Sequence, residues 1–161
     1  MRLRYQYVLR TYDPSLETIL YTDASKLHVG GALCQKVVNK DGTKDLVAVA
    51  FYSRSLRGPE LSYPIQQQEM LAIVASCAVF ERYLLCAQFT VRVCTDHRSL
   101  ASSQVGLSKI ACDRITRWCQ KIAVFNIKMQ YLPYTHDSIY SEPLTGRLRG
   151  KDCRRLAHSS D

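Results

Sequence analysis

Hydrophobic and polar residues alternate in three segments of the first third of the chain. Residues 18–23, 29–38 and 46–52 are rich in β-branched and aromatic side chains, a composition that favours strands. An Asp41-Gly42 pair lies between the last two segments and is typical of a tight hairpin turn. The pattern therefore predicts three consecutive strands that pair in antiparallel fashion.

A long helix is predicted next, from Pro64 to about residue 85. Proline is favoured in a first helical turn, because its missing N–H has no partner there anyway. Apolar residues then recur at helical spacing on one face, and the opposite face is apolar as well. We expect this helix to be buried between a sheet and another helix.

The second half of the chain predicts two more strands, at residues 89–95 and 127–132, and an amphipathic helix between them at 108–125. A further helix is predicted to begin at Ser141, with Glu142 in its first turn. Helical connections permit parallel pairing of the fourth and fifth strands. The predicted fold class is α/β, a five-stranded mixed sheet with three antiparallel strands followed by parallel ones and flanked by helices.

The length and charge of the chain limit the functions that it could have. The chain has 161 residues, which suits one compact domain. It carries 22 Lys and Arg against 14 Asp and Glu, a net charge of +8, and residues 81–161 hold 13 of these basic residues against 7 acidic ones. A basic half predicts a polyanionic partner such as nucleic acid, although a merely soluble cationic surface explains it equally well.

Membrane and secreted proteins are poor matches. The longest uncharged apolar stretch, residues 70–80, has eleven residues, whereas a spanning helix needs about 20. The basic start is not followed by an apolar signal core. The seven cysteines are odd in number and lack Cys-x-x-Cys spacing, which argues against a disulfide framework or a zinc site. We expect buried, reduced cysteines, an intracellular reducing compartment and no membrane partner.

Three carboxylates stand where ligand chemistry is expected. Asp23 and Asp96 end predicted strands, and Glu69 lies in an early turn of the buried helix. Ligands gather outside the carboxyl ends of strands in open α/β sheets, and grouped carboxylates favour a divalent cation such as Mg²⁺ or Mn²⁺. Each residue also has a plainer interpretation, because an Asp can cap a turn and a Glu near a helix start can interact favourably with the helix dipole.

Six ordered motifs link these acids to a known family. They are Thr22 to Ser25 with Gly30 to Gln35, Phe51 to Leu56, Tyr63 to Val74, Phe89 to Arg92, Thr95 to Leu100, and Arg117-Trp118. Together they resemble the ribonuclease H domain of reverse transcriptases, with the closest likeness to gypsy-type LTR retrotransposons or a gene derived from one. The likeness runs from about residue 8 to 145 and implies a ribonuclease H-like fold. We expect a connection segment at 1–17, the domain at 18–145 and a basic flexible tail at 146–161.

The resemblance implies an endonuclease that hydrolyses the RNA strand of RNA–DNA hybrids with two Mg²⁺ ions, for which Mn²⁺ can substitute. Carried over by position, Asp23 bridges both ions, while Glu69 and Asp96 hold the second. The family has an Asp as its fourth carboxylate, and Glu142 takes that place here. This departs from the family pattern, because Glu is one methylene longer, Pro143 fixes the neighbouring backbone, and Mg²⁺ tolerates little deviation from octahedral geometry.

Substrate contacts and partners also follow from the resemblance. The hybrid would be held through its phosphates and 2′-hydroxyls, and polymerase and integrase segments of the same polyprotein would be partners, in a cytoplasmic particle and the nucleus; no small-molecule substrate is implied. His136 is a candidate for product release, against the plainer interpretation of a solvated loop histidine, and Asp137 is a candidate substitute ligand. The candidate nucleic-acid contacts are Ser25, Arg54, Arg98, Arg114 and Arg117, the last two of which could instead form a solvent-facing helix edge.

Two other functions stay open at this point. A module that has kept the fold but lost catalysis would bind hybrid with strongly salt-dependent affinity, or serve as a scaffold, and Glu142-Pro143 favours it. A DNA strand-transfer enzyme on the same fold would use an Asp-Asp-Glu set. That chemistry does not require Glu69, and the sequence lacks the N-terminal zinc-binding His/Cys cluster expected of such an enzyme.

Overall fold

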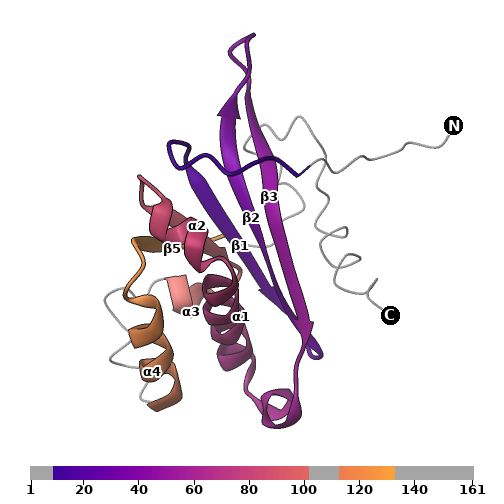
Figure 1. Cartoon of the computed structure of the whole chain (residues 1–161). Helices are drawn as coiled ribbons and strands as arrows, with labels where there is room; N and C mark the ends of the chain where they lie inside the picture. The colour runs from indigo at the N-terminus through magenta and orange to yellow at the C-terminus, as the bar shows by residue number, and fades with distance from the viewer. Residues whose placement is uncertain (1–8, 102–112, 133–161) are drawn as a thin grey trace, which may run out of the picture.

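The computed structural model describes residues 9–101 and 113–132. Within them, five strands form one sheet in the order β3-β2-β1-β4-β5 (Figure 1). β1, β2 and β3 pair in antiparallel fashion, whereas β4 pairs parallel with both β1 and β5. The predicted α/β fold with a mixed five-stranded sheet is confirmed. The strands are β1 Thr18–Ala24, β2 His28–Val38, β3 Lys44–Ser55, β4 Val91–Thr95 and β5 Ile127–Tyr131.

β2 and β3 form a long hairpin that projects past the rest of the sheet (Figure 1). Its turn has the predicted Asp-Gly chemistry. Gly42 has φ of 82°, a left-handed conformation that glycine adopts without steric cost. The Asp41 carboxylate accepts the Thr43 N–H at 2.9 Å, and the Thr43 carbonyl accepts the Asn39 N–H at 2.8 Å. Hairpin pairing carries β3 to residues 44–55, beyond the expected 46–52.

The described helices are η1 Gly58–Ser62 (a 3₁₀ helix), α1 Ile65–Val79, α2 Glu81–Cys86, α3 Arg98–Ala101 and α4 Asp113–Ile122. The single helix predicted from Pro64 to about residue 85 is therefore wrong in one respect, because it is divided at Phe80. Phe80 has φ of −94° and ψ of 13°, and its carbonyl accepts the Tyr83 and Leu84 N–H groups to begin α2. Its ring is buried in the core, which anchors the bend.

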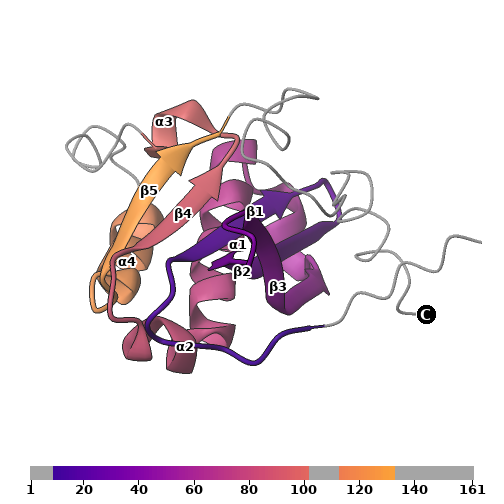
Figure 2. The ribbon, with the colours of Figure 1, turned by 90° about the horizontal axis from the view of Figure 1, so that it is seen from above.

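α1 lies between the sheet and α4, as the apolar character of both its faces predicts (Figures 1 and 2). Its Met70 and Ile73 side chains pack with Leu33 of β2 in the main core. The helix comes close to β2 at Gly31, where an added Cβ would clash with the Ser76 Oγ and lie 2.9 Å from the Ser76 Cβ. Only glycine fits at this position, and the close approach fixes the distance between α1 and the sheet.

Residues 9–17 of the predicted connection segment are described, and they bond to the domain. The Arg10 N–H donates to the Ala48 carbonyl of β3, and the Tyr12 hydroxyl donates to the Tyr83 carbonyl at 2.8 Å. Gln35 of β2 donates to the Asp13 carbonyl at 2.7 Å. Residues 1–8, the N-terminal part of the helix expected at 108–125, the helix expected at Ser141 and the predicted tail lie outside the described residues, so those boundaries stay predictions.

The five described cysteines are free thiols. Cys34, Cys77 and Cys94 are buried as expected, whereas Cys119 is half-buried and Cys86, the last residue of α2, is exposed, contrary to the expectation. Burial raises the pKa of the Cys77 thiol to about 12, so it stays protonated and behaves as a small apolar side chain. None of the helices within 9–101 and 113–132 has the length and apolar character needed to span a membrane.

Candidate metal centre

The ends of two parallel strands place Asp23 and Asp96 at one edge of the sheet. Asp23 is the next-to-last residue of β1, and Asp96 follows the last residue of β4. β1 and β4 run parallel, with Tyr21 opposite Cys94, so both carboxyl ends reach the same edge. The sequence-based expectation that ligand groups gather outside these ends is therefore met.

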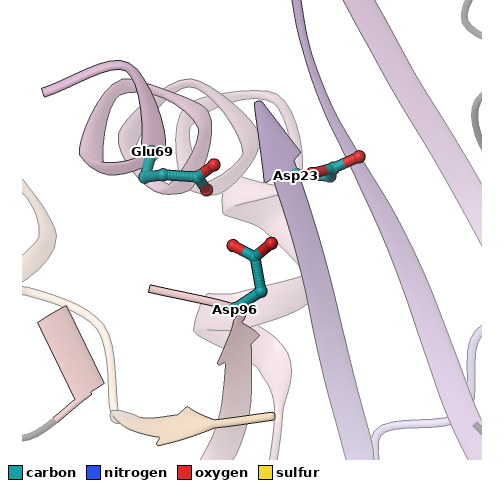
Figure 3. Close-up of side chains that lie close together, drawn as sticks. All are labelled: Asp23, Glu69 and Asp96. Carbon is teal, nitrogen blue, oxygen red and sulfur yellow. The ribbon is translucent and has the colours of Figure 1, made fainter. Parts of the chain in front are cut away.

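α1 brings the third carboxylate to this edge. Glu69 and Ser76 are seven residues apart and so lie on one face of the helix, two turns from each other. Ser76 faces Gly31 of β2, and Glu69 consequently points toward the end of β1. One potential ligand oxygen from each of Asp23, Glu69 and Asp96 lies within 4.8 Å of the other two (Figure 3). The structure thus brings together three acids that are separated by 46 and 27 residues in the sequence.

The three carboxylates differ in exposure. Glu69 is only 4% exposed, Asp23 is half-buried and Asp96 is exposed. Burial raises the pKa of Glu69 to about 8, and the negative charges of Asp96 and Asp23 add to this effect. A backbone hydrogen bond from Ala24 acts in the opposite direction. The metal-free cluster therefore holds Glu69 mainly in its protonated form at neutral pH.

The geometry of the cluster fits a hard divalent cation. The Glu69 Oε2 atom is buried and has no hydrogen-bond partner among the described residues, and such an atom costs free energy unless something occupies its lone pairs. A cation beside it would satisfy Oε2 and offset the repulsion from Asp23 and Asp96. Carboxylate oxygens are the ligands that Mg²⁺ and Mn²⁺ prefer. The site therefore has the donor set, the charge and the unsatisfied atom that such a cation requires.

The residues predicted to contact nucleic acid come from the β1–β2 turn, the end of β3, α3 and α4. Ser25 forms the β1–β2 turn, where its hydroxyl accepts the His28 N–H at 3.0 Å. Arg98 begins α3 and is exposed. Arg117 of α4 is also exposed, and its Nε donates to the Asp113 carbonyl of the same helix at 3.2 Å.

Arg54 and Arg114 make more extensive protein contacts. Arg54 forms a two-pronged ion pair with Glu60, with N···O distances of 2.6 and 2.9 Å. Arg114 stacks its guanidinium over the Tyr63 ring at 4.0 Å and donates to the Gln67 side chain at 2.6 Å. Sequence reasoning did not identify Glu60, Tyr63 or Gln67 as partners, because no spacing rule links residues across an irregular segment.

Three sequence-predicted residues fall outside the part of the chain that the structure describes. They are Glu142, the candidate fourth carboxylate, and the loop residues His136 and Asp137. Their predicted roles stay predictions. The described cluster consists of Asp23, Glu69 and Asp96.

Comparison with known proteins gives a consistent picture. A protein family described as "RNase H-like domain found in reverse transcriptase" matches residues 13–125. The Transposon Tf2-3 polyprotein of Schizosaccharomyces pombe is 34% identical over 126 residues, which cover 78% of this chain and 9% of that polyprotein. The chain thus spans about a tenth of the length of this relative.

Solved structures share the fold at low sequence identity. The native protease-reverse transcriptase of prototype foamy virus matches with a TM-score of 0.56 and 17% identity, over 94% of this chain and 22% of that one. The foamy viral protein in complex with an RNA/DNA hybrid matches with a TM-score of 0.53 and 17% identity, over 81% and 17%. LC11-RNase H1, isolated from compost, matches with a TM-score of 0.52 and 13% identity, over 84% and 97%. These likenesses establish the architecture of the sheet and helices.

Proposed function

This chain belongs to the RNase H-like domain family found in reverse transcriptase, and we propose that it hydrolyses the RNA strand of RNA–DNA hybrids within a gypsy-type LTR retrotransposon polyprotein. The observation that carries the proposal is the meeting of the Asp23, Glu69 and Asp96 carboxylates at one sheet edge. Because the chain belongs to this family, we interpret the cluster as a nuclease active site. The buried Glu69 Oε2 has no hydrogen-bond partner among the described residues, which favours a cluster that works by binding cations.

The three acids would divide the work according to their positions. Asp23 would contact both of two Mg²⁺ ions, with Glu69 and Asp96 holding the second, and Mn²⁺ would substitute for Mg²⁺. Two such ions supply an activated water and stabilise the leaving 3′ oxygen of a phosphodiester. Glu69 is buried and oriented by the Ala24 backbone, so it would anchor the inner side of the site. Asp96 is exposed and would face the substrate phosphate.

The hybrid would lie over the exposed side of this cluster. Contacts to phosphates and 2′-hydroxyls would distinguish RNA from DNA. Exposed Arg98 and Arg117 are the more accessible of the predicted contacts, together with Ser25 in the adjoining turn. One foamy viral relative in fold binds an RNA/DNA hybrid, which supports the same substrate class here. Polymerase and integrase segments of the same polyprotein, and an intracellular reducing compartment, are part of the proposal.

Strand-specific cleavage tests the proposal. A hybrid with its RNA strand end-labelled, a matching RNA duplex and a matching DNA duplex would be incubated with the protein in Mg²⁺ or in Mn²⁺. We expect cleavage of the RNA strand in the hybrid alone, and its loss in the Asp23→Asn variant and in EDTA. Absence of cleavage in both metals would overturn the proposal.

One sequence feature favours a second candidate function. Glu142-Pro143 stands where the family pattern has an Asp, so the domain would be a hybrid-binding or scaffold module if the longer side chain cannot reach a cation. That function predicts hybrid binding that weakens steeply with salt but without turnover. In that case Glu142→Asp would restore cleavage.

A further inference from the structure

The segment between β3 and α1 is held by a network centred on Glu60, which the proposed reaction does not use. The Glu60 carboxylate accepts two hydrogen bonds from the Arg54 guanidinium, at 2.6 and 2.9 Å. It also accepts the Arg57 backbone N–H at 2.9 Å. Arg54 donates in addition to the Ser55 carbonyl at 3.0 Å. Two hydrogen bonds therefore tie the end of β3 to the 3₁₀ helix η1, and a third ties the intervening residue Arg57 to the same carboxylate.

The backbone of Glu60 extends this network to α1. Its carbonyl accepts the Tyr63 N–H at 3.2 Å, which ends η1, and the Gln68 side-chain amide at 3.4 Å. Gln68 is buried in the first turns of α1 and directly precedes Glu69. The network therefore runs from the end of β3, through one carboxylate and one carbonyl, to the residue beside a proposed metal ligand.

The sheet provides a second link between the end of β3 and the start of α1. In register, Ala24 of β1 lies opposite Val29 of β2, and Val29 lies opposite Arg54 of β3. Ala24 bonds to the Glu69 carboxylate through its backbone. This row of paired residues is therefore linked to α1 at both ends. Ala24 bonds directly to Glu69. At the other end, Arg54 is linked through Glu60 to Gln68.

Apolar contacts next to this row hold the start of α1 against the sheet. Leu56, which follows β3, is buried with Val29 of the sheet and with Leu71 and Ala72 of α1. These contacts press the start of the helix onto the sheet but do not fix its rotation, because apolar contacts lack direction. The two-pronged Arg54–Glu60 bond is directional, and Glu60 transmits it to the helix.

We propose that Arg54 and Glu60 are a positioning pair that sets the orientation of the first turns of α1 and thereby the place of the Glu69 carboxylate relative to Asp23 and Asp96. The inference rests on the proposed function for its catalytic consequence. Mg²⁺ demands near-ideal octahedral geometry, so a small displacement of one ligand lowers turnover without weakening substrate binding. Arg54 then acts through Glu60, and its guanidinium is not a phosphate contact.

A double-mutant cycle tests the pair. Arg54→Met, Glu60→Gln and the combined variant would be compared with the parent for kcat and KM on labelled hybrid. Each single variant should lower kcat about tenfold or more with KM within about twofold, because ligand placement and not binding is lost. The combined variant should be no worse than either single one, since both remove the same interaction. The neighbouring Arg57→Met is the matched control and should retain parental kcat and KM, because the Arg57 backbone N–H that bonds to Glu60 is kept and its charge is the smallest of the effects on the Glu60 pKa.

A readout independent of turnover accompanies the kinetics. Mn²⁺ affinity, measured by electron paramagnetic resonance in the absence of substrate, should fall in Arg54→Met and Glu60→Gln and stay unchanged in Arg57→Met. Amide hydrogen exchange at Gln67 and Gln68, which donate to the Pro64 carbonyl, should accelerate in the same two variants. Arg54→Lys, which keeps the charge but loses the fork geometry, should resemble Arg54→Met and covers the case in which the methionine variant fails to fold.

Several results would overturn the pair. A rise in KM with unchanged kcat in Arg54→Met alone would identify a substrate contact instead, as would additive losses in the cycle. Parental kcat in Arg54→Lys would show that charge suffices without the fork. An inactive parent would count against the proposed nuclease, whereas unaltered Mn²⁺ affinity and hydrogen exchange in both variants would count against the positioning pair itself.

Discussion

The Asp96 carboxylate, just after β4, lies beside that of Glu69 on α1, with a potential ligand oxygen of each within 4.8 Å of the other. Burial of Glu69, together with this neighbouring charge and that of Asp23, raises its pKa to about 8. The metal-free cluster therefore keeps a proton on Glu69, whereas a bound cation would offset the three negative charges and release that proton.

The stability of the metal-free protein should fall as pH rises from 5 to 8. The pKa of Glu69 is raised in the folded state from its ordinary 4.5 to about 8, so the folded chain holds a proton that the unfolded chain releases within this range. The stabilising effect is complete below about pH 4.5 and is lost as pH rises toward the folded pKa, by at most about 1.4 kcal/mol per pH unit.

Urea unfolding in EDTA at several pH values measures this slope. Glu69→Gln is the control, because it cannot titrate, and its slope should be shallower than that of the parent by the Glu69 contribution. The two proteins share all other titratable groups, so the difference between the two slopes isolates Glu69. Identical slopes would contradict the raised pKa.

Asp96→Asn should separate stability from activity. The substitution removes a negative charge that faces buried Glu69, so the metal-free protein should become more stable at pH 8. It should at the same time abolish cleavage of hybrid and the rise in melting temperature that Mn²⁺ gives the parent, because a cation that binds only the folded state stabilises it. Thermal melts with and without Mn²⁺ check both effects. A variant that is destabilised in EDTA would show that Asp96 has a structural role instead.

Arg114 and Arg117 should behave differently although both lie on α4. Arg114 stacks on Tyr63 and bonds to Gln67, so Arg114→Ala should lower the free energy of unfolding by about 1–2 kcal/mol. Arg117 is exposed, with one contact to its own helix, and Arg117→Ala should leave stability within about 0.5 kcal/mol of the parent.

Hybrid binding, in contrast to stability, should depend more on Arg117 than on Arg114. Arg117→Ala should weaken binding and reduce the slope of log affinity against log salt by about one, as expected for the loss of one phosphate contact. Fluorescence anisotropy at several salt concentrations measures this slope. An unchanged slope would remove Arg117 from the proposed nucleic-acid surface.

The contact between Gly31 of β2 and Ser76 of α1 should not tolerate a side chain. A Cβ on residue 31 would clash with the Ser76 Oγ and lie 2.9 Å from its Cβ, so Gly31→Ala should destabilise the fold by about 1–3 kcal/mol. Ser76→Ala should be neutral or stabilising, because the buried hydroxyl has no partner within the described residues.

Chemical denaturation of the single and combined variants checks this packing. Ser76→Gly removes both close atoms and should recover part of the loss caused by Gly31→Ala, beyond its own cost as a helical glycine of about 1 kcal/mol. A fully additive combination would show that the two positions do not contact each other.

The antiparallel pairing of the first three strands and the choice of the three candidate acids could be predicted, because both depend on local patterns. Alternation and an Asp41-Gly42 turn identify the β2–β3 hairpin, and a carboxylate at the end of each of two parallel strands must reach one sheet edge. Glu69 was predicted because it is a carboxylate in an early turn of a helix expected to be buried. In each case a short-range feature of the sequence determines the outcome.

The remaining features depend on contacts that the sequence pattern does not encode. Hydrophobic spacing continues unchanged across Phe80, so the division between α1 and α2 is set by burial of its ring and not by a helix-breaking residue. The Arg54–Glu60 bond crosses an irregular segment of a type that no periodicity describes. Arg114 was predicted as a substrate contact from the family resemblance, whereas its stacking on Tyr63 requires the packing of α4 beside α1.

Crystals of the protein soaked in Mn²⁺, with anomalous difference maps, show whether the three acids hold a pair of cations. Two anomalous peaks are expected at the edge where β1 and β4 end, with a carboxylate oxygen of Asp23 contacting both cations and the Glu69 Oε2 contacting one. A map without a peak among Asp23, Glu69 and Asp96, at a Mn²⁺ concentration that occupies other sites, would rule out this metal-binding role.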